Sequence, residues 1–171
     1  MSHAFELGPI RPPSEAYSLL VRITRNCPWN KCAFCSTYRG QTFSRRSVDE
    51  IKSDIDAMRA IADRIRDAVQ NSGTHGRITE EVLAHARGQD DTPEYYYRQM
   101  AFWLYHGIKT AFLQDANSLL LPARELVEIL GYLREKFPSI ERITTYARAK
   151  TISKKTLEEL VQLKDAGLSR L

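Results

Sequence analysis

The sequence predicts an α/β fold built on a parallel sheet. Apolar runs of strand length, at residues 18–23, 109–114 and 141–146, alternate with longer stretches in which apolar residues recur every three or four positions. Strands and helices that alternate at this interval are typical of βαβ units, which have parallel strands and right-handed crossovers. A tight group of cysteines follows the first run, within residues 27–35. We therefore expect the cysteines in a loop at a strand end, where α/β barrels keep their chemistry.

The first helix is expected to begin after Ser47. Ser47 and Glu50 form the Ser-x-x-Glu pattern of a capping box, and residues 71–73 (Asn-Ser-Gly) end the helix. The apolar residues between these limits form one stripe, which we interpret as a core face rather than a cofactor surface. Its members are Val48, Ile51, Ile55, Met58, Ala62, Ile65 and Val69.

Residues 74–107 are predicted to be a helical insertion between the first helix and the second strand. Thr79 would cap a short helix over 80–87, and residues 92–93 (Thr-Pro) would supply the N-cap and first residue of a helix over 94–105. The helix over 94–105 is rich in aromatic residues. They provide either a platform for stacking bases or, as we favour, a core face. The expected core residues are Tyr96, Met100 and Trp103.

Three further segments complete the prediction. Residues 1–16 are rich in proline and are interpreted as an extended strap over the bottom or edge of the barrel. Pro122 would be the first residue of a helix that ends at Phe137, before Pro138. Ser153 would cap the next helix, and residues 168–171 would begin a fourth strand.

Length and composition exclude several classes of protein. The 171 residues fit a single domain, with 43% hydrophobic and 27% charged residues. No apolar run approaches the roughly 20 residues of a membrane span, and the N-terminus lacks the apolar segment of a signal peptide. With reduced cysteines, these features predict a cytoplasmic protein that does not bind membranes. The net charge of +4 permits an anionic partner without requiring one.

Cys27, Cys32 and Cys35 are the three cysteines of the chain. Three thiols cannot all pair as disulfides, and a structural zinc site needs a fourth ligand. The histidines show no ligand spacing relative to these cysteines; they are His3, His75, His85 and His106. Three thiolates alone suit an iron–sulfur cluster that leaves one iron open. Arg25, Lys31 and Arg39 lie nearby in sequence and would favour the thiolate state.

The segment Cys27-Pro-Trp-Asn-Lys-Cys32-Ala-Phe-Cys35 resembles the cluster loop of the radical S-adenosylmethionine (SAM) superfamily. That family places a Cys-x3-Cys-x2-Cys loop after the first strand of a partial (β/α) barrel. The first gap here is one residue longer, whereas the second gap and the aromatic residue Phe34 match. Residues 112–119, 143–148 and 155–168 are similar to the family's second strand, third strand and third helix.

The resemblance implies a fold, a reaction and two cofactors. The fold is a partial parallel (β/α) barrel of the TIM-barrel type, incomplete in this chain. Cys27, Cys32 and Cys35 would ligate a 4Fe–4S cluster, and SAM would chelate the fourth iron. An electron from the reduced cluster, supplied by a flavodoxin or ferredoxin, would cleave SAM. The resulting 5′-deoxyadenosyl radical would abstract a hydrogen from an unknown substrate.

The resemblance also implies SAM contacts. Phe34 would lie near the adenine, and the turn Gln114-Asp115-Ala116-Asn117, which replaces the family's usual Gly-Gly-Glu, would meet the SAM amino group. Arg148 would meet the SAM carboxylate. Ordinary turn chemistry explains Asp115 and Asn117 equally well, and a solvated arginine explains Arg148.

The match covers about the first half of the family's core. Three and a half βα units do not close a barrel, so we expect an open side with unpaired backbone. The chain is then a fragment, an early-terminated reading frame, or a piece that a further segment or a dimer completes. By itself it is expected to be incomplete as an enzyme.

Three alternatives to a radical SAM enzyme stay open. The first is a non-catalytic iron–sulfur protein for electron transfer or cluster delivery. The second is a zinc-stabilised RNA-binding module that uses the three cysteines and one histidine, with the aromatic helix as its platform. The third is an inactive fragment that folds around reduced cysteines.

Overall fold

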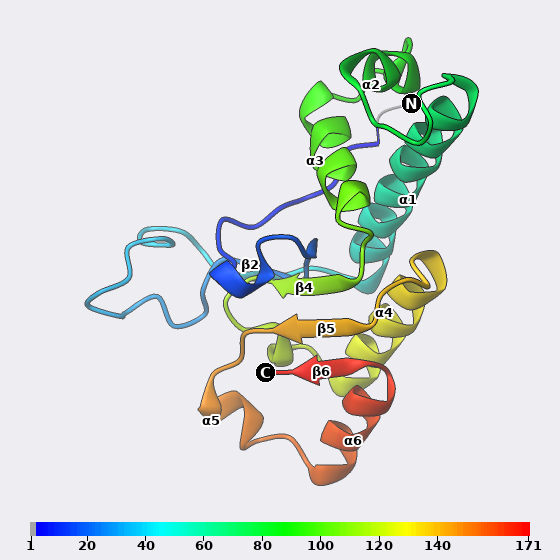
Figure 1. Cartoon of the computed structure of the whole chain (residues 1–171). Coiled ribbons are helices and arrows are strands. Elements are labelled where there is room, and N and C mark those ends of the chain that lie inside the picture. The colour runs from blue at the N-terminus through cyan, green and yellow to red at the C-terminus, as the bar shows by residue number, and fades with distance from the viewer. Residues whose placement is uncertain (1–2) are drawn as a thin grey trace.

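A computed structural model describes residues 3–171 as an α/β fold with a four-stranded parallel sheet (Figure 1). The strand order is β1-β4-β5-β6, and each strand pairs in parallel with its neighbour. The strands are β1 (Leu19–Arg22), β4 (Thr110–Gln114), β5 (Arg142–Thr145) and β6 (Leu168–Arg170). The three predicted adjacent parallel strands are therefore confirmed, as is a fourth. The sheet is open, with β1 and β6 at its edges.

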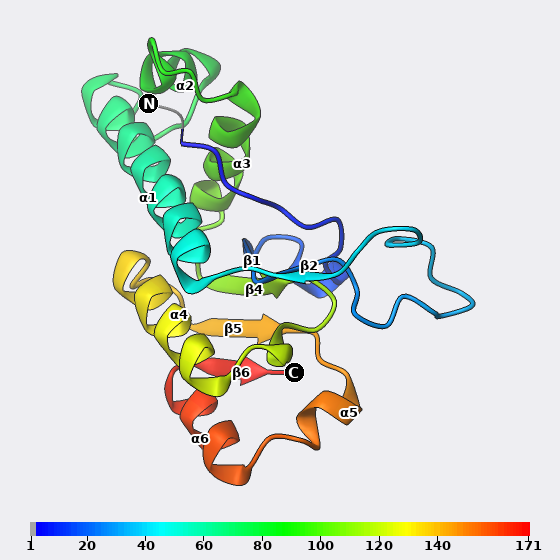
Figure 2. The same ribbon diagram turned by 180° about the vertical axis from the view of Figure 1, so that it is seen from behind.

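The helices that follow the strands pack side by side along the sheet (Figures 1 and 2). These helices are α1 (Val48–Asn71), α4 (Ala123–Lys136) and α6 (Leu157–Asp165). Their apolar stripes and the central strands form the core, in which each buried aliphatic side chain contributes about 1.5–3 kcal/mol. The fully buried side chains include Val21, Ile51, Ile55, Met58, Ile61, Leu113, Ile129, Leu130 and Leu133.

The capping box at Ser47 is present as predicted: its side chain accepts from the Glu50 amide, and Glu50 accepts in return from the Ser47 amide. Two other helix starts differ from the prediction. Pro122 is the N-cap of α4 rather than its first residue. Thr156, not Ser153, caps α6, because it forms a complete capping box with Glu159.

Residues 74–107 contain α2 (Glu80–Arg87) and α3 (Glu94–Tyr105), which pack against α1. Thr79 caps α2 as predicted, whereas the N-cap of α3 is Pro93 and makes no side-chain cap. Met100 and Trp103 are buried as expected, and Tyr96 is partly buried and packs against the core. Tyr97, which was not expected in the core, is fully buried.

The position of Tyr97 is explained by the buried carboxylate of Asp90. Asp90 accepts hydrogen bonds from the Tyr97 hydroxyl at 3.0 Å, the Thr92 amide at 3.1 Å and an Arg64 nitrogen at 2.8 Å. Burial opposes the charged form of Asp90, yet these bonds hold its pKa below the ordinary value. Burial and the Asp90 bond raise the pKa of Tyr97 to about 12. The Asp90 bond therefore satisfies the hydroxyl of Tyr97 in its buried position.

The N-terminal strap runs from the helices of residues 74–107 to the carboxyl end of β4 (Figures 1 and 2). The His3 amide donates to Thr92, Phe5 packs edge-on against Tyr96 with ring centres 4.7 Å apart, and Gly8 contacts Gln114. The strap was predicted over the bottom or edge of the barrel. Its residues 6 and 7 contact Arg22 of the edge strand β1, and residues 8–10 reach the carboxyl end of β4 rather than the bottom. Residues 1 and 2 of the predicted strap lie outside the described residues.

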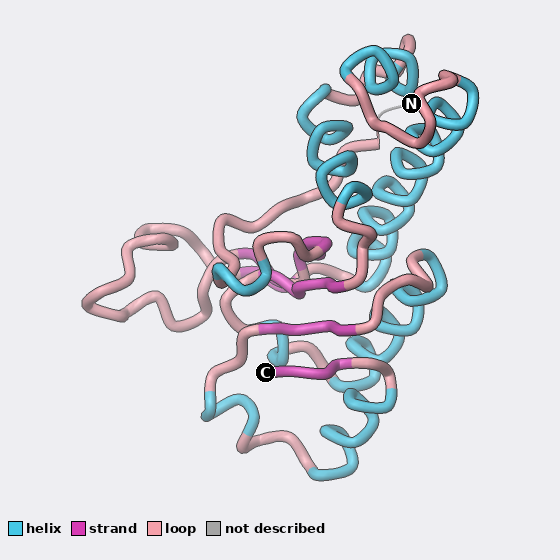
Figure 3. Tube along the Cα trace, viewed as in Figure 1, coloured by secondary structure: helices cyan, strands magenta, loops and turns pink. Residues whose placement is uncertain are grey.

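Long loop segments lie at the end of the sheet toward which the strand arrows of Figure 1 point (Figures 1 and 3). They include a two-stranded antiparallel ladder, β2 (Thr24–Arg25) with β3 (Ser44–Arg45), and the short helix α5 (Ala149–Ile152). Short 3-10 turns, η1 (Pro13–Glu15) and η2 (Ser118–Leu120), lie in the connections. Within residues 3–171, no helix combines the length and apolar character needed to cross a bilayer.

Replacing Asp90 with alanine should destabilise the protein, because the buried Tyr97 hydroxyl and Thr92 side chain would lose their partner. We expect a loss of about 1–3 kcal/mol in the free energy of unfolding, measured by urea denaturation. The matched control is Asp91→Ala, since Asp91 is exposed. Equal losses in the two variants would contradict this account of α2 and α3.

Candidate metal centre in the cysteine loop

The cysteines lie in a loop, residues 26–43, that we call the cysteine loop. It projects beyond the carboxyl end of the sheet (Figure 1). The β2–β3 ladder closes its base, pairing Thr24 with Arg45 and Arg25 with Ser44. The Asn26 side chain adds a cross-loop bond, donating to the Thr42 carbonyl at 2.7 Å. The sequence thus forms a closed loop in which both ends are fixed.

Two asparagines shape the interior of the loop. Asn26 and Asn30 adopt φ values of 66° and 46°, a left-handed conformation that asparagine tolerates better than most residues. The turn at Asn30 lets its side chain donate to the Tyr38 carbonyl at 2.6 Å. Its backbone amide donates to the Cys27 sulfur at 3.4 Å.

All three cysteines are free thiols and are half-buried. Within residues 3–171, no group of three or more cysteine, histidine, aspartate or glutamate side chains is gathered closely enough to hold a metal ion. The loop therefore supplies three thiols in one segment, and a bound cluster would have to draw them together. The thiols could move together while the base of the loop stays fixed, because its anchoring contacts lie at residues 24–26 and 42–45.

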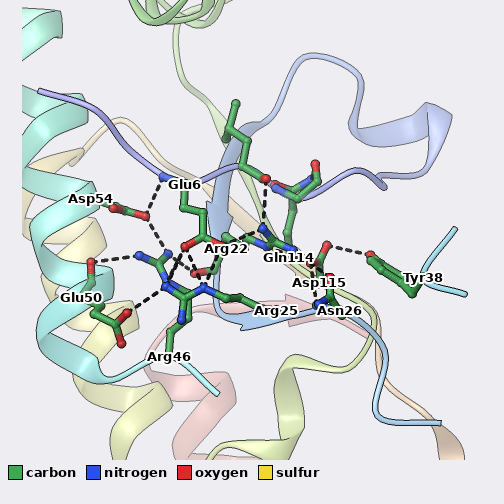
Figure 4. A network of polar contacts seen from close by, with 12 residues as sticks. Glu6, Arg22, Arg25, Asn26, Tyr38, Arg46, Glu50, Asp54, Gln114 and Asp115 are labelled. Atoms are coloured by element: carbon green, nitrogen blue, oxygen red, sulfur yellow. Dashed lines mark hydrogen bonds and ion pairs between the residues drawn. The ribbon is translucent and has the colours of Figure 1, made fainter. Parts of the chain in front are cut away.

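Asp115, directly after β4, anchors the cysteine loop to the sheet (Figure 4). Its carboxylate is completely buried. It accepts a hydrogen bond from the Asn26 amide at 3.3 Å, before the first cysteine, and one from the Tyr38 hydroxyl at 2.8 Å, after the last. The Arg22 guanidinium pairs with the same carboxylate at 2.7 Å. Asp115 thus holds both sides of the cysteine-bearing segment.

Tyr38 completes this anchor from a buried position. Burial and the bond to Asp115 raise the pKa of Tyr38 well above its ordinary value, so its hydroxyl stays protonated and donates. The Tyr38 ring is buried beneath the cysteine loop, whose other residues are half-buried or exposed.

A network of arginines and carboxylates surrounds this anchor (Figure 4). Glu6 of the strap pairs with Arg22 at 2.7 Å and with Arg25 at 2.7 Å. Burial works against the charged form of Glu6, but the neighbouring arginines lower its pKa below 4.5 overall. Arg46 joins the network through Asp54 at 2.6 Å and the Arg22 carbonyl at 2.8 Å. The strap, the loop base and α1 are thereby fixed to one another.

Gln114 binds the strap through both ends of its amide. Its oxygen accepts from the Gly8 amide at 2.9 Å, and its nitrogen donates to the carbonyls of Gly8 and Ile10 at 2.9 and 2.8 Å. Gly8 lies so close to Asp115 that a β-carbon would overlap the carboxylate. Glycine is therefore required there by close approach rather than by backbone angle.

Asn117 and Arg148 form a second junction, between the ends of β4 and β5. The buried Asn117 side chain donates to Thr151 at 2.8 Å and accepts from the Arg148 amide at 3.3 Å. The Arg148 guanidinium lies over the Trp29 ring, 4.5 Å from its centre, and so reaches the cysteine loop. Phe34 belongs to neither junction, because its side chain is 93% exposed.

The structure thus brings Asp115 to the base of the cysteine loop and Arg148 to its flank, and it leaves Phe34 in solvent. Gln114, Asp115 and Asn117 are buried, and all three have protein partners. Their predicted SAM contacts stay predictions. Sequence reasoning missed Tyr38, Asn26 and Gly8. The asparagine next to Cys27 was a usable signal, because asparagine often marks a left-handed turn.

Replacing Asp115 with alanine should release the cysteine loop and destabilise the protein. Leaving Arg22 without this buried partner should cost about 3–5 kcal/mol of unfolding free energy. Relative to the wild type, the substitution should accelerate amide hydrogen exchange in residues 26–43 more than in α1.

Tyr38→Phe serves as the milder test, since it removes only the hydroxyl and should cost about 1 kcal/mol. Tyr105→Phe is its control, because Tyr105 is 82% exposed. Unchanged exchange in the loop of both Asp115→Ala and Tyr38→Phe would refute the anchor.

Glu6 should stabilise the strap in a pH-dependent way. Its pKa is lower in the folded chain, so its contribution is complete above about pH 4.5 and is lost as the pH falls through the folded-state value. The stability difference between wild type and Glu6→Gln, measured by urea denaturation, should be constant near neutral pH and shrink on acidification. A difference that grows below pH 4.5 would contradict the assignment.

Comparisons of this chain with protein-family models, with curated proteins and with solved structures gave no match. The functional conclusion therefore rests on the cysteine loop and its surroundings.

Proposed function

We propose that this chain is a radical SAM iron–sulfur protein. One observation carries the proposal: three thiols share one loop, and that loop leaves the first strand of a parallel sheet at the carboxyl end. The open four-stranded sheet is, on this proposal, part of a (β/α) barrel of the TIM-barrel type.

The donor set fits a 4Fe–4S cluster. Cys27, Cys32 and Cys35 are unpaired thiols, and thiolates are the usual ligands of such clusters. The Asn30 amide already donates to the Cys27 sulfur, a contact that stabilises negative charge on sulfur. Half-burial keeps the thiols accessible to incoming iron and sulfide.

When bound, the cluster would supply the electron for reductive cleavage of SAM and hence for hydrogen abstraction from a substrate. The chain's own residues would hold and shield it. Asp115 and Tyr38 would fix the two sides of the loop, and Gln114 would keep the strap in place. We further propose that Phe34, Gln114, Asp115, Asn117 and Arg148 lie along the SAM-binding face.

We also propose an electron donor, a cellular compartment and a polypeptide partner for this chain. The electron would come from a small reductant such as a flavodoxin or ferredoxin, in a cytoplasmic environment. A further polypeptide segment or a second copy would complete the enclosure of SAM and substrate.

A second candidate function is a non-catalytic iron–sulfur protein, for electron transfer or cluster delivery. It is favoured by the engagement of Gln114, Asp115 and Asn117 with protein partners, since this function needs no SAM pocket. The two functions differ in one measurement. SAM should perturb the electron paramagnetic resonance spectrum of the reduced cluster in a radical SAM protein and leave that of a carrier unchanged.

Anaerobic reconstitution should load about four iron and four sulfide per chain. Replacing any one of the three cysteines with alanine should abolish the cluster, because each is expected to hold one iron. Iron and sulfide assays, with the visible absorption of the cluster, provide the measurement.

Ser36→Ala is the control, since Ser36 lies in the same loop without a thiol. Full iron content in a triple cysteine variant would overturn the proposal. Zinc at about one per chain without sulfide would instead favour the zinc-stabilised module.

A further inference from the structure

A basic cavity lies beside the cysteine loop. Its volume is about 380 Å³, which suits a small molecule or part of one. The walls come from the cysteine loop, from the segment after β4 and from α5 with its flanks. The lining residues are Pro28, Trp29, Asn117, Leu120, Arg148, Lys150, Thr151 and Lys154.

The charge of the cavity is one-sided. Arg148, Lys150 and Lys154 contribute three cations, and the lining includes no aspartate or glutamate. Lys155, next along the chain, faces elsewhere: its ammonium donates to the Leu121 carbonyl at 3.0 Å and lies 3.7 Å from Glu159. A concave site with uncompensated positive charge favours an anionic ligand.

The cavity is also held in shape. The Asn117 side chain fixes the Arg148 amide and the Thr151 hydroxyl, so the β4 and β5 sides cannot separate freely. The indole of Trp29 stacks with the Arg148 guanidinium and limits where that guanidinium points. A guanidinium oriented in this way offers paired donors to a carboxylate or phosphate.

We propose that this cavity binds the phosphate or carboxylate group of a small molecule, and, resting on the proposed function, that this molecule is the substrate. The SAM carboxylate is needed at the open iron in that function, and none of the three cysteines lines the cavity. Arg148 is one of the proposed SAM contacts, whereas Lys150 and Lys154 are not, so these two lysines provide charge for a second anion. The cavity adjoins the cysteine loop through Trp29, which places a bound substrate beside the site of chemistry.

The test uses the full chain without a cluster, so it does not depend on iron. Pyrophosphate, inorganic phosphate and malonate are titrated by calorimetry at an ionic strength kept constant with sodium chloride. We expect saturable binding of one anion per chain. Trp29 fluorescence should change in parallel, because Trp29 is 46% exposed whereas Trp103, the other tryptophan, is buried.

The variant Lys150→Gln/Lys154→Gln should weaken binding by about tenfold or more, as expected when charged hydrogen bonds are lost. Both lysines are exposed, so the fold should be retained. Arg148→Gln should weaken it similarly. The matched control is Lys164→Gln/Arg170→Gln, which removes two exposed charges from another part of the chain.

Equal weakening in the control pair, or no saturable binding of any of the three anions, would overturn the cavity proposal while leaving the cluster proposal intact. SAM serves as a competitor in a separate titration. Displacement of pyrophosphate by SAM, with the same dependence on Lys150 and Lys154, would overturn the substrate assignment. Anion binding without displacement by SAM supports it, whether or not a cluster can later be assembled.

Discussion

The buried carboxylate of Asp115 holds together three segments that are distant in the sequence. Arg22 reaches it from β1, whereas Asn26 and Tyr38 reach it from either side of the cysteines. A buried charge is tolerated only when it is paired and hydrogen-bonded, so each donor is required for the others to stay in place. This requirement fixes the direction in which the cysteine loop leaves the sheet. It also excludes a side chain at Gly8, which ties the strap to the same point.

The strap and the cysteine loop are consequently parts of one assembly. Glu6 neutralises Arg22 and Arg25, and Gln114 binds the backbone of residues 8–10. Without Glu6, the two arginines would repel each other at the base of the loop. Residues that precede the first strand therefore stabilise the segment that follows it. The helices of residues 74–107 take part as well, because the strap begins against Thr92 and packs Phe5 on Tyr96.

Local patterns predicted the sheet and most of the helices. The apolar runs gave parallel strands in the right order, and the capping residues Ser47 and Thr79 marked helix starts, since such signals depend on neighbouring residues alone. Long-range polar contacts were not predictable in this way. Asp115 could equally have been a turn residue, and Tyr97 gave no sign that it would be fully buried beside the partly buried Tyr96. Both outcomes depend on partners outside the local pattern: Tyr38 is 77 residues from Asp115, and Asp90 lies in the loop seven residues before Tyr97.

Two junctions at the carboxyl end of the sheet, one around Asp115 and one around Asn117 and Arg148, have different roles in the candidate site. Asp115 binds the cysteine loop at its base, whereas Asn117 fixes the Arg148 amide and the Thr151 hydroxyl of α5. Trp29 belongs to the loop yet stacks on Arg148, so it joins the two. Any movement of the loop on cluster binding would shift Trp29 and hence the guanidinium beneath it. Cluster assembly and anion binding should for that reason be coupled, with Trp29 as the physical link between the thiols and the basic cavity.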